Sequence, residues 1–189
     1  MCGWCDLAAE PLGIVAMSFR VPQRNDALVI RRARAADADA IDKVHVQSWQ
    51  EAYRGLLPQP YLDQLSLAAH GRQWRRTFAD GGWAFVAQWK DRVVGFGSGG
   101  LSRGRRDVSG ELYLLYVLRS CHGRGIGRAL FDACHYELAR CGHRGMLVWV
   151  LADNAARCFY ERLGGEPAGE SMVALAGVRL RELAYLWRD

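Results

Sequence analysis

The chain has 189 residues and a mass of 21.2 kDa, which suits one compact domain and is too short for two enzymatic domains. Half of its residues are hydrophobic and 24% are charged, an ordinary globular composition that excludes disordered and fibrous classes. Its formal charge of +5 favours anionic partners without naming nucleic acid. Neither of its two lysines, Lys43 and Lys90, follows a glycine, which excludes a Walker-type phosphate loop.

Cysteine usage and hydropathy point to the cytoplasm. The chain is long for a disulfide scaffold, so we expect its six cysteines to be reduced thiols. Its apolar runs are shorter than the ~20 residues that a membrane helix needs, and no membrane association is expected. Residues 1–27 show no sustained period and are predicted to be a poorly ordered N-terminal extension, with residues 28–189 as the domain.

The periodicity predicts a mixed α/β domain with, in chain order, a strand, two helices, three strands, a helix, a strand, a helix and two strands. Lys90-Asp91 would join two of the strands as a hairpin. The expected strands are 28–32, 83–89, 92–101, 111–118, 146–151, 170–175 and 180–187, and the expected helices begin after Asp37, at Tyr61, near Ile126 and after Asp153 or Asn154.

The most informative segment runs from Val117 to Leu130, where a buried strand passes through three alternating glycines into a helix. Glycines allow main-chain N–H groups to converge on an anion, and the helix start adds unpaired donors and the positive end of its dipole. A phosphate or pyrophosphate fits this site, and the neighbouring arginines can add charge-assisted bonds at its edge. The alternative is a tight strand-to-helix turn with no ligand.

The dinucleotide fingerprint G-x-G-x-x-G/A does not fit the segment. Starting at Gly123 places Arg128 at the third position, and starting at Gly125 places Leu130 there. No well-placed acidic residue follows to bind a ribose. A Rossmann-type dinucleotide site is therefore disfavoured.

The segment instead resembles the acyl-CoA pyrophosphate loop of the GNAT superfamily of N-acetyltransferases, whose pattern is Q/R-x-x-G-x-G/A. Residues 122–127, His-Gly-Arg-Gly-Ile-Gly, match it except that His122 replaces Gln or Arg. The strand before the loop, the helix after it and the stretch from Asn154 to Gly164 agree with the family in order. The resemblance covers about Leu28 to Trp187 and implies the GNAT fold, with a sheet that splays open between strands 111–118 and 146–151.

The resemblance also implies a binding mode for acetyl-CoA as acyl donor, without a metal. The main chain at residues 115–117 would pair with the pantetheine arm like an added strand, and one amide there would polarise the thioester carbonyl. Family members also use the equivalent of Asn154 near pantetheine, although this residue is a helix cap in the simpler interpretation. The expected cofactor-binding residues are Leu115, Tyr116, Val117, His122, Gly123, Arg124, Gly125, Ile126, Gly127, Arg128 and Asn154.

Two residues match catalytic positions of the family. Glu111, at the start of the central strand, resembles the carboxylate that removes a proton from the amine, directly or through water; the alternative is a surface carboxylate at a strand end. Tyr160 occupies the position of the tyrosine that protonates the thiolate; the alternative is plain packing. Tyr53 and Arg54 precede Gly-Leu-Leu-Pro between the first two helices, where the family builds its acceptor pocket, and are candidates for specificity.

Other chemistry is less well supported. Cys121 lies beside the loop, but acyl-cysteine chemistry needs a base that the sequence does not place there. The cysteines and histidines at 134–143 lack the paired spacing of a metal site. Asp63, Glu51 and Glu170 are available for a cationic acceptor, but one sequence cannot place them.

The sequence therefore predicts a cytoplasmic N-acetyltransferase that moves the acetyl group of acetyl-CoA to a primary amine by direct attack within a ternary complex. The partners are acetyl-CoA and an amine-bearing acceptor, without nucleic acid or membrane, and a homodimer is left open. One alternative is a non-catalytic acyl-CoA-binding regulator. Another is an RNA-associated basic module, which would use the arginines at 72, 75, 76, 103, 105 and 106.

Overall fold

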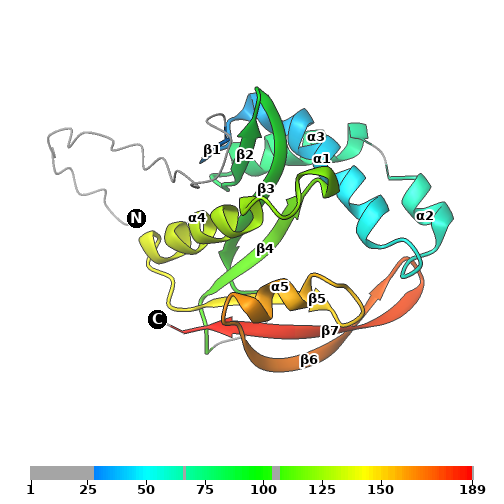
Figure 1. Cartoon of the computed structure of the whole chain (residues 1–189). Coiled ribbons are helices and arrows are strands. Elements are labelled where there is room, and N and C mark those ends of the chain that lie inside the picture. The colour runs from blue at the N-terminus through cyan, green and yellow to red at the C-terminus, as the bar shows by residue number, and fades with distance from the viewer. Residues whose placement is uncertain (1–27, 66, 104–106, 189) are drawn as a thin grey trace, which may run out of the picture.

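The computed structural model describes residues 28–65, 67–103 and 107–188, apart from the side chains of residues 67–71. The predicted extension at 1–27 and the arginines at 105 and 106 lie outside the described residues. The described strands form one mixed sheet in the order β1-β2-β3-β4-β5-β7-β6 (Figure 1). Their bounds are β1 Leu28–Arg32, β2 Phe85–Trp89, β3 Arg92–Leu101, β4 Gly110–Val117, β5 Met146–Leu151, β6 Glu166–Leu175 and β7 Val178–Trp187.

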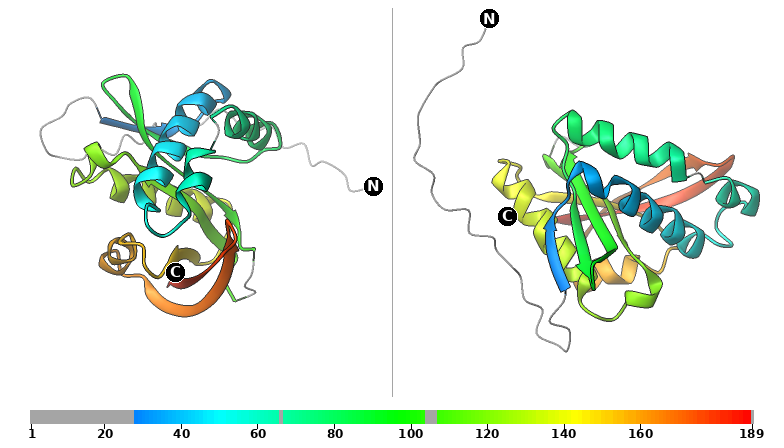
Figure 2. Two further views of the ribbon diagram at one scale, coloured as in Figure 1. Left: turned by 90° about the vertical axis from the view of Figure 1, so that its right-hand side faces the viewer. Right: turned by 90° about the horizontal axis from the view of Figure 1, so that it is seen from above.

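Helices cover both faces of the sheet (Figure 2). Helix α1 and Trp74 of α3 pack on Phe96 and Leu114 on one face, whereas α4 packs on Leu112 and Leu115 on the other. Short 3-10 turns at 35–37 and 119–121 precede α1 and the glycine loop. The helices are α1 Ala38–Ala52, α2 Gln59–Asp63, α3 Leu67–Ala79, α4 Ile126–Arg140 and α5 Arg157–Arg162.

The sheet opens between its two central parallel strands. β4 pairs with β5 only through Gly110, Glu111 and Leu112, whose partners are Met146, Leu147 and Val148. Beyond Leu112 the two strands diverge, and β5 continues to pair with β7. The ribbons of β4 and β5 move apart beyond this paired segment (Figure 1). The β5-facing edge of β4 therefore has no strand partner from residue 113 onward, as the family resemblance predicted.

A β-bulge in β4 sets the direction of its side chains. Gly99 of β3 pairs with Leu112 and Ser98 pairs with Leu114, so Tyr113 has no residue opposite it in the register of β3. An extra residue reverses the alternation of a strand. Leu112 and Leu115 consequently both pack on the α4 side, while Leu114 packs on the α1 side.

The predicted order of elements is confirmed, with local corrections. The expected helix from Tyr61 toward Phe78 is two helices, because α2 ends at Asp63 and α3 begins at Leu67. Asp37 makes no side-chain cap to α1. Its carboxylate instead accepts bonds from Arg31 and from the main chain of Arg34, so it links the first strand to the turn before α1.

The described part of the chain contains no helix that is both long and apolar enough to cross a membrane.

Candidate active site

The glycine loop joins β4 to α4 and presents a run of unpaired main-chain donors. The amides of Cys121 and His122 donate to Leu118 and Arg119, and the next amide with a main-chain acceptor is that of Ala129, which donates to Gly125. Among the described residues, the six amides from 123 to 128 therefore donate to no main-chain acceptor. The first amides of any helix lack acceptors within it. Here residues 123–125 of the loop add three more amides without a main-chain acceptor.

Two glycines give the loop a conformation that other residues rarely adopt. Gly123 has φ +71° and Gly125 has φ +76°, in the left-handed region where a Cβ atom is strained. Gly125 is the N-cap residue of α4. These angles let the chain turn from β4 into the helix within a few residues, with its free amides at the helix start, where the dipole also favours an anion.

The polar side chains of the loop have protein partners. His122 is exposed, and its Nε2 lies 2.8 Å from the carbonyl oxygen of Val117, so its ring braces the loop against the end of β4. The guanidinium of Arg124 stacks on the ring of Trp89, 4.7 Å from the centroid, and Arg128 pairs with Asp132 on α4. The groups that remain free to bind an anion are thus the main-chain amides.

A cleft of about 200 Å³ lies where β4 and β5 separate. Its walls come from β4 and β5, from the end of α1, from the turn at Asn154, from α5 and from the β6–β7 pair. Tyr53, a predicted specificity residue, lines it, whereas Arg54 does not. The lining residues are Trp49, Tyr53, Leu112, Tyr113, Leu114, Leu115, Tyr116, Val148, Trp149, Val150, Leu151, Asn154, Ala156, Tyr160, Val173, Leu175 and Glu182.

Tyr160 is the buried residue of α5 and lines the cleft. Its ring packs against Phe159, Tyr185 and Trp187. Burial, the largest cause, raises the pKa of its hydroxyl above the ordinary value, so the phenol keeps its proton well into the alkaline range. The three- and four-residue spacing of Ala155, Cys158, Phe159 and Leu163 predicts a shared packed face, but Ala155 and Cys158 are exposed in the structure.

A hydrogen-bonded group of aromatic residues forms the α1 side of the cleft. The indole N–H of Trp49 donates to the Tyr116 hydroxyl at 2.9 Å, and the hydroxyls of Tyr53 and Tyr116 lie 3.3 Å apart. Burial raises the pKa values of both tyrosines. The polar atoms of this wall satisfy one another, so it presents mainly ring faces and edges to the cleft.

Asn154 caps the turn before α5 and not the helix itself, whose N-cap is Ala156. Its side-chain oxygen accepts a bond of 2.8 Å from the amide of Ala156, which fixes the chain just before α5. The residue also lines the cleft. A structural role and a place beside a ligand are therefore compatible, as the sequence suggested.

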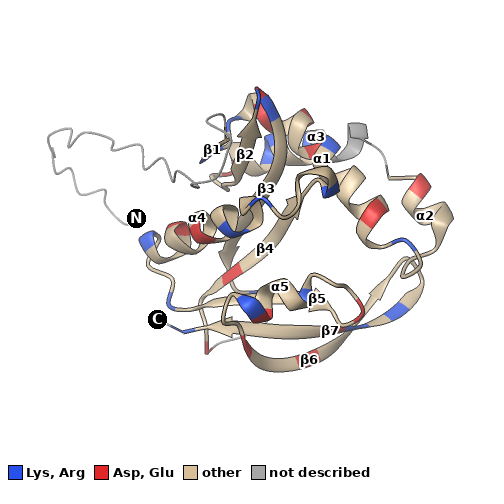
Figure 3. Ribbon diagram, viewed as in Figure 1, with Lys and Arg blue, Asp and Glu red and all other residues tan. Residues whose placement is uncertain are grey.

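Glu111 is buried, and Arg103 engages both of its carboxylate oxygens. The Arg103 amide donates to Oε2 at 2.8 Å, and its guanidinium donates to Oε1 at 2.6 Å and 3.1 Å. The Glu111 side chain is 3% exposed, and it is not among the residues that line the cleft. Glu111 is the one charged residue of β4, near the start of the strand (Figure 3). The structure thus places Glu111 where β4 and β5 are still paired, and its carboxylate has no direct access to the cleft.

Glu182 of β7 is a cleft residue that the sequence analysis missed. It pairs opposite Leu151, at the end of β5, and is half-buried. Burial is the first cause, and proximity to Glu111 the second, of a raised pKa for its carboxyl. The signal was present in the alternation of β7, because Glu182 follows half-buried Leu180 and precedes buried Ala184 at two-residue spacing.

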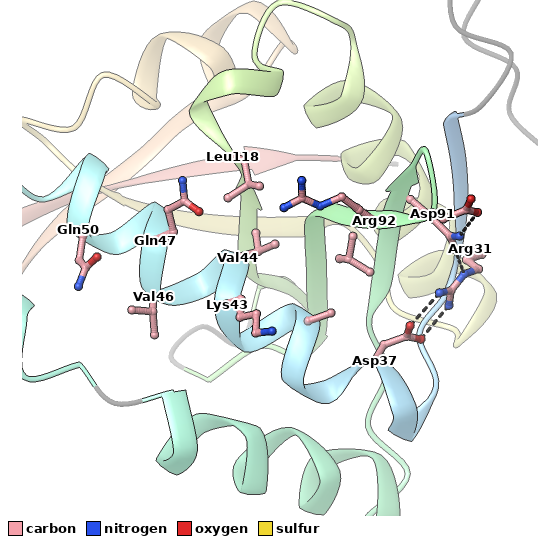
Figure 4. A pocket seen from close by; sticks show the side chains of 13 residues that line it. Arg31, Asp37, Lys43, Val44, Val46, Gln47, Gln50, Asp91, Arg92 and Leu118 are labelled. Carbon is pink, nitrogen blue, oxygen red and sulfur yellow. Dashed lines mark hydrogen bonds and ion pairs between the residues drawn. The ribbon is translucent and has the colours of Figure 1, made fainter.

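A larger hollow of about 730 Å³ lies on the other side of α1, against the β2–β3 hairpin (Figure 4). Arg31 and Asp37 form an ion pair of 2.7 Å at one end, and Lys43 and Arg92 also line it. Its lining includes neither Tyr160 nor any residue of the glycine loop. The hollow is therefore separate from the cleft between β4 and β5.

The cysteines of the described residues are absent from the lining of the cleft, although Cys134 is buried in the cluster that contains Tyr160. Cys121 is buried among Ile30, Ile126 and Leu130, and no cysteine lines the cleft. Within the described ranges, no three His, Cys, Asp or Glu side chains are grouped so as to hold a metal ion.

Comparisons with known proteins agree with this geometry. Residues 80–164 match the model of the acetyltransferase (GNAT) domain, a range that includes β4, the glycine loop and Tyr160. An uncharacterized N-acetyltransferase of Bacillus subtilis, YuaI, is 35% identical over 164 residues, which cover 86% of this chain and 94% of that protein. The chain belongs to the GNAT acetyltransferase family.

Solved GNAT structures share the fold. A GCN5-related N-acetyltransferase of Rhodopseudomonas palustris superposes with a TM-score of 0.68 at 21% identity, covering 88% of this chain and 99% of that one. The acetyltransferase yncA of Salmonella typhimurium, solved with its cofactor acetyl-CoA, gives a TM-score of 0.65 at 21% identity, covering 86% and 94%. The predicted GNAT fold is thereby confirmed.

Proposed function

We propose that this GNAT protein is an N-acetyltransferase that moves the acetyl group of acetyl-CoA to a primary amine within a ternary complex. The observation that carries the proposal is the run of free amides at residues 123–128, which follows the end of β4, the strand that separates from β5 after Leu112. A diphosphate is the group that such a run of donors at a helix start suits best.

The residues of the loop fit the diphosphate of coenzyme A. The amides of Gly123, Arg124, Gly125, Ile126, Gly127 and Arg128 supply the donors, and the His122 ring keeps the loop against Val117. Arg124 and Arg128 contribute positive charge at the edge of the site, although their guanidinium groups already contact Trp89 and Asp132.

The pantetheine arm would lie along the open edge of β4. Residues 115–117 have main-chain groups on the side from which β5 has departed, and an extended amide chain can pair there as an added strand. Leu115, Tyr116 and Asn154 line the space that would hold it. A main-chain amide of this edge would also donate to the thioester carbonyl oxygen as it gains charge.

Two residues would move the protons. Acetyl-CoA supplies an acetyl group bonded to sulfur; the C–N bond forms as the C–S bond breaks. Tyr160 lines the cleft with a phenol that burial keeps protonated, so it can donate to the departing sulfur. Glu111 would accept the proton of the amine through water, since Arg103 occupies both of its oxygens and blocks a direct contact.

Direct attack is preferred over an acyl-enzyme route because no cysteine lines the described cleft. Initial-rate measurements at several fixed concentrations of each substrate distinguish the two. Intersecting double-reciprocal lines support a ternary complex, and parallel lines would support an acyl-enzyme.

The test is an acceptor screen. Acetyl-CoA should raise the melting temperature of the protein, and adding a library of primary amines should release free thiol with at least one of them. Thermal stabilisation without thiol release from any amine would overturn the proposal and favour a non-catalytic acyl-CoA-binding regulator.

A further inference from the structure

One acidic or basic side chain lines the described cleft between β4 and β5. All seventeen residues that line it are described, and Glu182 is the only Asp, Glu, Lys or Arg among them. The other lining residues are aromatic, aliphatic or, in the case of Asn154, a neutral amide that already bonds to Ala156. Glu111 lies nearby but is engaged by Arg103.

The carboxylate of Glu182 lies within electrostatic reach of Arg103, but that guanidinium is paired with Glu111. Among the described residues no ion pair or hydrogen bond reaches it, whereas its strand neighbour Arg181 pairs with Glu170, 3.3 Å away. A half-buried carboxylate without a partner favours an incoming cation, because ion pairing offsets its lost hydration. Burial, the first cause, and the negative charge of Glu111 raise the pKa of the Glu182 carboxyl, whereas Arg103 lowers it.

The rest of the acceptor side is aromatic. The rings of Trp49 and Tyr53 meet edge to face with centroids 4.9 Å apart, and both line the cleft with Tyr113 and Trp149. A second or third ammonium group on the same acceptor would meet these rings without a carboxylate, and cation–π attraction alone compensates a buried charge less than an ion pair does. Burying such a charge unpaired is unfavourable, whereas an apolar or aromatic body would fill this space well.

We propose that Glu182 binds the ammonium group of the acceptor, and that the acceptor is a monoamine carried on an aromatic or apolar body rather than a polyamine. This inference rests on the proposed acetyltransferase function and names the substrate class of the same cleft. Glu182 acts as a specificity-determining residue: it holds the amine beside the thioester, and the proton leaves toward Glu111 through water.

The probes are 2-phenylethylamine, the polyamine spermidine and the uncharged analogue 2-phenylethanol. Thiol release should show a higher kcat/KM for 2-phenylethylamine than for spermidine, and 2-phenylethanol should inhibit competitively against the amine. Glu182→Gln should raise KM for 2-phenylethylamine by about tenfold or more, because it removes a charged hydrogen-bond partner. The inhibition constant of 2-phenylethanol and KM for acetyl-CoA should stay unchanged.

Glu166→Gln is the matched control, since Glu166 is an exposed carboxylate on the neighbouring strand β6 and should leave every constant unchanged. A preference for spermidine, an unchanged KM in Glu182→Gln, or an equal loss of affinity for the alcohol would each overturn the inference. If other amines release thiol but 2-phenylethylamine does not, the inference fails alone. If no amine of the library does, the proposed function fails with it.

Discussion

Exposed Arg103 forms an ion pair with buried Glu111, and its main-chain N–H and guanidinium engage both carboxylate oxygens of Glu111. The same guanidinium lies over the ring of Tyr113, 4.1 Å from its centroid. Glu111 stands where β4 is still paired with β5, and Tyr113 is the bulge residue that follows. Arg103 therefore ties the loop after β3 to the point where the sheet begins to open.

Loss of this arginine should destabilise the protein. Arg103→Ala leaves the buried Glu111 carboxylate without its cation, and the free energy of unfolding should fall by about 1–3 kcal/mol. Urea denaturation at neutral pH measures the change, with Arg76→Ala on the exposed side of α3 as the control. The double variant Arg103→Ala/Glu111→Gln should recover part of the loss; a double variant less stable than Arg103→Ala would contradict this explanation.

Gly125→Ala should weaken the binding of coenzyme A. A Cβ atom at φ +76° is strained by about 1 kcal/mol and shifts the amides of the loop, so we expect the Kd for coenzyme A to rise at least about tenfold, as misaligned charge-assisted bonds are lost. Isothermal titration calorimetry measures this constant.

Gly142→Ala is the matched control for this glycine. Gly142 has φ +81° and no atom within 4 Å of an added Cβ, and it lies at the far end of α4. The Gly142→Ala variant should lose about as much stability as Gly125→Ala but keep its affinity for coenzyme A. Equal losses of affinity in the two variants would show that general strain, and not the loop, is responsible.

Tyr160→Phe should slow turnover while the affinity for coenzyme A is kept. General acid catalysis contributes about 10²–10⁴-fold to a rate, so kcat should fall by at least about a hundredfold if sulfur needs this proton. The comparison is Tyr185→Phe, which removes a hydroxyl bonded to Glu161 beside the same ring stack. A kcat equal to that of the parent protein would assign Tyr160 to packing alone.

Glu137 offers a test of stability against pH. The hydrogen bond from Arg140, the first cause, and that from Arg32 lower the pKa of its carboxyl. Because the folded-state pKa lies below the unfolded value of ~4.3, the stabilisation is fully present above that value and is lost as pH falls through the folded pKa.

Glu137→Gln should therefore cost roughly 1–2 kcal/mol at pH 7, since both arginines are about half exposed, and the cost should shrink below pH ~4. Urea denaturation across this pH range provides the measurement. Asp39→Asn, at an exposed pair with Arg75, should change stability much less. A cost that stays constant down to acid pH would contradict the role of the ion pairs.

The fold was largely predictable from local patterns. Strands 28–32, 92–101 and 146–151 match the structure residue for residue, since each is a β-favouring run bounded by turn or charged residues. The break between α2 and α3 was missed, because apolar spacing does not register a short interruption in which no glycine or proline appears. The cap at Asp37 was misassigned because its carboxylate bonds to a residue of β1.

The candidate site was predictable in part. The glycine loop and Tyr160 each belong to a short continuous motif, at residues 122–127 and 154–164, so both motifs could be recognised. The contacts of Glu111 with Arg103 and the position of Glu182 depend on pairing between distant segments. Local periodicity does not predict which distant segments pair. The two-residue alternation of β7 nevertheless places Glu182 on the same face as Leu180 and Ala184, and this pattern is visible in the sequence.

Binding of a diphosphate by the loop is tested most directly by NMR, from the chemical shifts of the amides of residues 123–128 in ¹⁵N-labelled protein. Saturation with coenzyme A should shift these amides more than any others, and pantetheine, which has no diphosphate, should leave them in place while it shifts residues 113–117. Coenzyme A that binds to saturation without moving the amides of 123–128 would contradict the account.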